Sequence, residues 1–242
     1  MTKKELLEFI ASSGLPGAVK GYFSRSVALR TPSGLRTALK KDPPAFIGNI
    51  GRLLADGAAA LGCADGEALF VTGFNPNDLA PERFWSALAE LRAVLFLARE
   101  GFSGLTLLRQ SGGTGADISG QRGDGVYVFD VRCLRAGRAA GPLAYLAGGP
   151  AAPGRPPAAA VEYLRLKYDK KIRQVNSSRK KTGHKYGGVI LALDPAGLSG
   201  GPAPAALKEL AAALHLAKNS PPCTHVCLLA GTAGAVFPDW PR

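Results

Sequence analysis

The strongest constraint on the fold is the segment 126–133, which consists of Val-Tyr-Val-Phe-Asp-Val-Arg-Cys. β-branched and aromatic residues dominate this segment, and such residues favour a β-strand. Two shorter strands are expected just before it, at 104–110 and 115–119, because glycine-rich turns separate these segments from one another. The middle of the chain is therefore expected to form a meander of three strands.

Helical segments flank this meander and set the fold class. Before it, Phe84, Leu88, Leu91 and Leu95 recur at a spacing close to 3.6 residues, which predicts a helix that starts at Pro81. After it, the sequence predicts a basic helix, a buried strand, an amphipathic helix and a last buried strand, the final three at 189–193, 204–217 and 224–230. The order α-β-β-β-α-β-α-β predicts an α/β fold with a mixed sheet flanked by helices.

The chain of 242 residues is expected to divide into two parts. Residues 1–78 form a basic, mainly helical N-terminal extension, and residues 79–242 form the α/β domain. Within that domain, the Gly-, Ala- and Pro-rich segment 136–159 predicts a flexible loop. The Gly- and Pro-rich tail from residue 231 onward is expected to be irregular.

Positive charge is concentrated in two blocks, residues 1–60 and residues 162–185. The net charge is +12, and the segment 162–185 alone holds nine basic and two acidic residues. Clustered lysine and arginine is typical of proteins that bind a phosphate backbone, so we expect a nucleic-acid partner. A basic helix on the solvated surface, or one that meets an acidic protein or a membrane surface, is the alternative. The candidate contacts are Lys167, Lys170, Lys171, Arg173, Gln174, Arg179, Lys180 and Lys181.

Several classes of protein are disfavoured. No run of about 18 apolar residues is present, so a membrane-spanning helix is not expected. Acidic residues in the first ten positions argue against a signal peptide. The four cysteines lack the spacing of a zinc site, and reduced thiols in a cytoplasmic protein are the expectation.

Two aspartates in the meander form the first candidate site. Antiparallel pairing of 115–119 with 126–133 brings Asp117 next to Asp130, and period-two alternation puts Arg132 on the same face as Asp130. Two adjacent carboxylates repel each other unless a cation lies between them, and Mg²⁺ or Mn²⁺ suits oxygen ligands. The alternatives are a turn aspartate at 117 and a solvated ion pair between Asp130 and Arg132.

A third acid precedes the meander. Glu90 lies in a helical row that is otherwise apolar, with Ala87, Val94 and Leu97. A glutamate that faces the sheet in such surroundings needs a partner or a metal ion, whereas an exposed glutamate needs neither.

Taken in this order, the chain resembles the PD-(D/E)XK nuclease superfamily, which has the restriction-endonuclease-like fold. The resemblance covers roughly residues 80–230. Asp117 matches the first acid of the motif, Asp130 matches the second, and Arg132 stands in the place of the motif lysine. Glu90 matches a glutamate that family members carry on the preceding helix. The basic helix after the motif strand is matched by Lys170, Lys171, Arg173 and Gln174.

The resemblance implies a metal-dependent phosphodiesterase that acts on DNA or RNA. Asp117, Asp130 and the main-chain carbonyl of Val131 would hold Mg²⁺ or Mn²⁺, and Glu90 would assist through water. Arg132 would stabilise negative charge on the phosphate, although arginine cannot serve as a base. The alternative is a catalytically inactive module of the same fold that binds nucleic acid or a partner protein, with residues 1–60 as a docking or homodimer segment.

Overall fold

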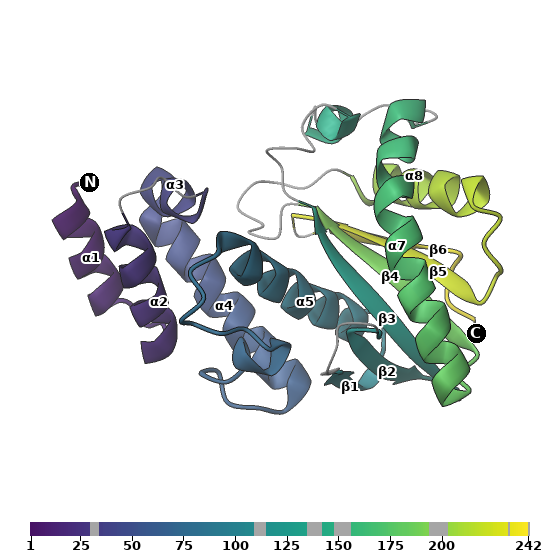
Figure 1. Cartoon of the computed structure of the whole chain (residues 1–242), viewed down its shortest axis with the longest axis horizontal. Coiled ribbons are helices and arrows are strands. Elements are labelled where there is room, and N and C mark those ends of the chain that lie inside the picture. Colours follow the sequence, from purple (N-terminus) through teal and green to yellow (C-terminus); the bar gives the residue numbers. More distant parts are fainter. Residues whose placement is uncertain are drawn as a thin grey trace.

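The computed structural model of the chain describes residues 1–29, 34–108, 115–134, 142–147, 156–193, 203–231 and 233–241. Within these residues it confirms an α/β fold, in which helices cover both faces of a six-stranded mixed sheet. In Figure 1 the first four helices lie at one end of the molecule, the sheet lies at the other end, and helix α5 runs between them.

The strands lie side by side in their order along the chain. They are β1 (Ser103–Leu107), β2 (Ile118–Arg122), β3 (Gly125–Leu134), β4 (Tyr186–Leu193), β5 (Thr224–Ala230) and β6 (Ala233–Phe237). β1, β2 and β3 form the predicted antiparallel meander. β3, β4 and β5 are parallel, and β6 returns antiparallel to β5. The parallel pairs need crossover connections, which helices α7 (Ala158–Thr182) and α8 (Pro204–Ala217) provide.

The two faces of the sheet are covered by different helices. Leu164 and Val175 of α7 pack with Val128 of β3, and α8 packs against the same face. Phe129 of β3, one residue further along the strand, belongs to a separate core on the face covered by α5 (Pro81–Arg99). Alternation along β3 therefore assigns each of its side chains to one helical layer, and Asp130 falls on the face of α7.

The N-terminal helices are α1 (Lys3–Ser12), α2 (Gly17–Ala28), α3 (Gly34–Lys41) and α4 (Pro43–Leu61). Thr2 begins α1 with a capping box to Glu5, and the carboxylate of Asp42 caps α4. Phe84 of α5 packs into the aromatic core of these helices, whereas Val94 of the same helix packs against the sheet. Helix α5 is thus shared by both cores and joins the N-terminal helices to the sheet.

Three details correct the sequence expectations. The tail expected to be irregular contains β6, in which Ala233 pairs with Ala230. The segment 136–159 contains a short 3-10 helix at Ala144–Ala147, and α7 already begins at Ala158; residues 135–141 and 148–155 lie outside the described part. The second strand begins at Ile118 rather than at residue 115, so Asp117 precedes it.

A short 3-10 helix, η1 (Phe70–Thr72), connects the N-terminal helices to α5. All four cysteines are free thiols. Across the described ranges, every helix is too short or too polar to span a lipid bilayer.

Candidate active site

Asp117 and Asp130 lie opposite each other where β2 begins. The antiparallel register pairs Ile118 with Phe129, and one step further it places Asp117 opposite Asp130. The backbone nitrogen of Asp117 donates to the carbonyl of Phe129 at 2.8 Å, and the carbonyl of Asp117 accepts from the amide of Leu108 at 2.8 Å. The predicted adjacency of the two aspartates is therefore confirmed.

The carboxylate of Asp117 is fixed by the neighbouring strand. Its Oδ2 accepts a hydrogen bond from the backbone nitrogen of Val131 at 2.7 Å. The Asp117 side chain is 28% exposed, so part of this carboxylate still faces solvent. Val131, which was predicted to offer its carbonyl to a metal, thus contributes its amide to Asp117, while its side chain packs in the core beneath α5.

Asp130 is buried and has few polar neighbours that could stabilise its negative charge. Its side chain has no exposed surface. No backbone amide or hydroxyl of the described residues donates a hydrogen bond to either carboxyl oxygen. Its polar neighbours are the carboxyl group of Asp117 and the ammonium of Lys171.

Lys171 of α7 bridges the two aspartates. Its Nζ contacts Oδ1 of Asp130 and lies 3.7 Å from Oδ2 of Asp117. The lysine side chain is only 14% exposed. The sequence placed Lys171 among the nucleic-acid contacts on the outside of the basic helix, but its side chain points inward and completes the acidic site.

The surroundings of Asp130 raise its pKa well above the usual value. Burial first, and then the hydrogen bond and the negative charge of Asp117, raise the pKa of Asp130 from its usual value to about 8, while Lys171 opposes the shift. Two carboxylates this close do not both ionise easily without a cation. The raised pKa favours the protonated form of Asp130 at pH 7, next to the side chain of Lys171.

Glu90 approaches this site from the other helical layer. It is partly buried on α5, and its pKa is well above the usual range because of burial first, then the charges of Asp117 and Asp130, against the opposing charge of Lys171. The charges of Asp117, Asp130 and Lys171 therefore all act on Glu90. Even so, no three His, Cys, Asp or Glu side chains of the described residues converge closely enough to form a metal-ligand cluster.

Arg132 lies on an exposed part of β3. Its side chain is exposed, although Asp130, two residues earlier on the same face of β3, is fully buried. No ion pair joins Arg132 to either aspartate in the part of the chain that the structure describes. The positive charge that contacts Asp130 is that of Lys171.

The remaining residues of the predicted nucleic-acid set differ in how far they are exposed on α7. Arg179 turns inward, where it donates to Thr224 Oγ1 at 3.2 Å and to the carbonyls of His184 and Lys185, so it anchors α7 to the sheet. Lys167 lies over the Tyr163 ring at 5.4 Å from its centroid. Exposed on α7 are Lys170, Arg173, Lys180 and Lys181, whereas Lys167 and Gln174 are partly buried.

Ser178 positions the site and was not identified from the sequence. Its buried hydroxyl accepts a hydrogen bond from the backbone nitrogen of Ala116 at 2.8 Å, immediately before Asp117. Ser178 lies seven residues after Lys171, which puts both side chains on one face of α7. The apolar residues Leu164 and Val175 mark that same buried face, and this was the available signal.

The donor set suits a hard divalent cation. Asp117 and Asp130 offer two adjacent carboxylates, and no backbone amide or hydroxyl of the described residues donates to Asp130 in competition with a cation. Mg²⁺ is commonly held by one or two carboxylates, with water and substrate phosphate in its other positions. The site residues thus fit such an ion, provided that Asp130 loses its proton when the ion binds.

Comparison of the chain with protein-family models, with curated proteins and with solved structures found no match.

Proposed function

We propose that the chain is a metal-dependent phosphodiesterase that cleaves DNA or RNA, and that its sheet is a divergent restriction-endonuclease-like fold of the PD-(D/E)XK type. The observation that carries this proposal is the pair of facing aspartates, Asp117 and Asp130, with the Lys171 ammonium between them. The same helix that provides Lys171 carries an exposed basic row.

Each residue of the site has a distinct task in this proposal. Asp117 and Asp130 would hold Mg²⁺ or Mn²⁺, which when bound supplies a Lewis acid and a water of lowered pKa. Val131 keeps the Asp117 carboxylate oriented through its amide. Lys171 stabilises the negative charge that develops on the phosphate oxygens, the role that the sequence motif assigned to Arg132. Glu90 accepts or returns a proton from its place beside the pair.

The exposed row on α7 would hold the nucleic-acid backbone. Lys170 and Arg173 flank Lys171 on the helix, and Lys180 and Lys181 extend the row toward its C-terminal end. Ten residues of helix between Lys170 and Lys180 span about 15 Å. Phosphates on one strand of a duplex recur about every 3.4 Å along its axis, so this row is long enough to contact several of them.

A binding module without catalytic activity is the second candidate, and one observation favours it. Lys171 already neutralises the aspartates, so the site is electrostatically satisfied by the chain itself. In this alternative the fold and the basic row serve to bind nucleic acid, and the buried lysine has a structural role.

A cleavage assay separates the two candidates. Purified chain is incubated with labelled single-stranded DNA, double-stranded DNA or RNA in Mg²⁺, in Mn²⁺ or in EDTA. The nuclease proposal predicts cleavage of at least one substrate that requires the ion and is lost in Asp130→Asn and Asp117→Asn. Asp124→Asn, at an exposed position in the β2–β3 turn, is the matched control and keeps full activity. Salt-sensitive binding with no cleavage under any condition would establish the binding module instead.

A further inference from the structure

The two facing aspartates already hold a cation that the chain itself supplies. Nζ of Lys171 contacts Oδ1 of Asp130 and lies 3.7 Å from Oδ2 of Asp117. When both carboxylates are ionised, the ammonium balances one of their two negative charges. A metal ion that binds these carboxylates therefore has to compete with a side chain that binds the same two groups.

Burial makes this competition strong. The Asp130 side chain has no exposed surface, and the Lys171 side chain is only 14% exposed, so water screens their charges little. An ion of charge +2 held by the same carboxylates is repelled by the ammonium, because like charges in a poorly solvated site interact far more strongly than in water. The cluster therefore does not readily hold the ammonium and a divalent ion together.

The site gives the ammonium a route to solvent on the side of Asp117. The Asp117 side chain is 28% exposed, in contrast to the fully buried Asp130. Lysine carries its charge on a flexible four-carbon stem, so rotation of the side chain alone can move the ammonium while the backbone of α7 stays in place. The adjacent Lys170 is exposed, so solvent reaches this turn of α7.

We propose that Lys171 is a resident cation of the aspartate site, and that a divalent ion displaces it toward solvent when the ion binds. This inference rests on the metal site proposed above at Asp117 and Asp130. The lysine lowers the affinity of the site for the ion, so the site fills only at a higher ion concentration than the two aspartates alone would need. Displacement also frees the ammonium to face a substrate phosphate.

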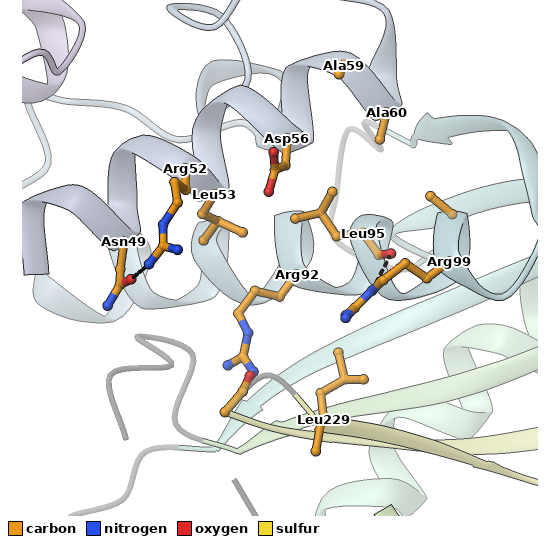
Figure 2. A pocket seen from close by; sticks show the side chains of 13 residues that line it. Asn49, Arg52, Leu53, Asp56, Ala59, Ala60, Arg92, Leu95, Arg99 and Leu229 are labelled. Carbon is orange, nitrogen blue, oxygen red and sulfur yellow. Dashed lines mark hydrogen bonds between the residues drawn. The ribbon is translucent and has the colours of Figure 1, made fainter. Parts of the chain in front are cut away.

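A cavity elsewhere in the molecule provides a control for this proposal. It has a volume of about 560 Å³ and lies between α4, α5 and the end of β5, as Figure 2 shows. Among the described residues that line it, Asp56 is the only acid, and Arg52 and Arg99 line the same space. A single carboxylate among arginines does not favour a divalent cation. Asp56→Asn should therefore leave ion binding unchanged.

Titration calorimetry of the full chain with Mn²⁺ at pH 8 tests the displacement. Lys171→Met removes the ammonium and keeps an unbranched side chain, and it is expected to bind Mn²⁺ about tenfold or more tightly than wild type. The gain persists in competition with protons, because the ammonium repels an ion of charge +2 more strongly than a proton. Lys170→Met removes an exposed charge from the next position of α7 and should change the affinity by less than about twofold.

A second measurement on the wild-type chain needs no variant. Brief acetylation with acetic anhydride, followed by mass spectrometry of the peptides, reports the reactivity of each lysine. Saturating Mn²⁺ is expected to raise the reactivity of Lys171 severalfold, because the amine leaves the carboxylates for solvent. The exposed Lys170 should react equally with and without the ion.

Displacement of Lys171 and nuclease activity can fail separately. A folded Lys171→Met variant that binds Mn²⁺ no more tightly than wild type, or a Lys171 reactivity that Mn²⁺ leaves unchanged, would overturn the displacement even where the wild-type chain cleaves nucleic acid. Tighter binding by Lys171→Met together with a more reactive Lys171, but without cleavage of any substrate, would support the displacement and reject the nuclease. Absence of Mn²⁺ binding in both wild type and Lys171→Met would overturn both.

Discussion

The ammonium group of Lys171 contacts the fully buried carboxyl group of Asp130, and it is the cation that two adjacent acids on neighbouring strands require. This contact joins the basic helix α7 to the strand meander. It makes the charge state of the site and the stability of the fold depend on each other.

Removal of Lys171 should destabilise the chain more at high pH than at low pH. In Lys171→Gln, Asp130 loses its cationic partner, and the cost falls on the ionised carboxylate. We expect a loss of about 1–3 kcal/mol in the free energy of unfolding at pH 8.5, and less at pH 6, where Asp130 stays protonated. Urea unfolding at both pH values measures this. The exposed neighbour Lys170→Gln is the control and should change stability by less than about 0.5 kcal/mol.

Asp130 should also impose a pH dependence on the wild-type chain in EDTA. Its pKa is about 8 in the folded chain and near 3.8 when unfolded, so the folded chain holds the extra proton between these values. The stabilising contribution of this proton is complete below about pH 4 and is lost as the pH rises toward 8. Asp130→Asn lacks this loss, so its stability relative to wild type should increase by about 1–3 kcal/mol between pH 5 and pH 8. An equal difference at both pH values would contradict the shifted pKa.

Ser178 should contribute measurably to the free energy of unfolding, although it bears no charge. Ser178→Ala leaves the backbone amide of Ala116 without its buried acceptor, which costs roughly 1–2 kcal/mol. The loss should appear in chemical denaturation, together with faster amide exchange at Ala116 and Asp117. Ser177→Ala, one residue earlier and without this bond, should behave as wild type.

The exposed end of the basic row should contribute to nucleic-acid affinity through counterion release. Lys180→Gln/Lys181→Gln should lower the slope of log K against log salt by up to about 1.8 for duplex DNA, if each lysine neutralises one phosphate. Fluorescence anisotropy between 50 and 200 mM NaCl gives this slope. The pair Lys40→Gln/Lys41→Gln carries the same charge change on α3 and should leave the slope intact. Equal effects of the two pairs would show that net charge, and not α7, governs binding.

Local patterns predicted the meander and therefore the facing aspartates, because a hairpin fixes its own register. They did not predict β6, since the segment Ala-Gly-Ala-Val-Phe carries a weak strand signal and gains its stability by pairing with β5. The sequence also did not predict that Lys171 contacts Asp130. This contact depends on where α7 crosses β3, which tertiary packing determines.

Titration of Mn²⁺ into the apo chain tests the central claim most directly, because the ion must displace the proton that the raised pKa of Asp130 favours. The proposal predicts an ion site at pH 8 that weakens by up to about tenfold per unit as the pH falls toward 6, and that disappears in Asp117→Asn and Asp130→Asn but not in Asp124→Asn. Absence of saturable Mn²⁺ binding in the wild-type chain at pH 8, or binding that survives both substitutions, would contradict it.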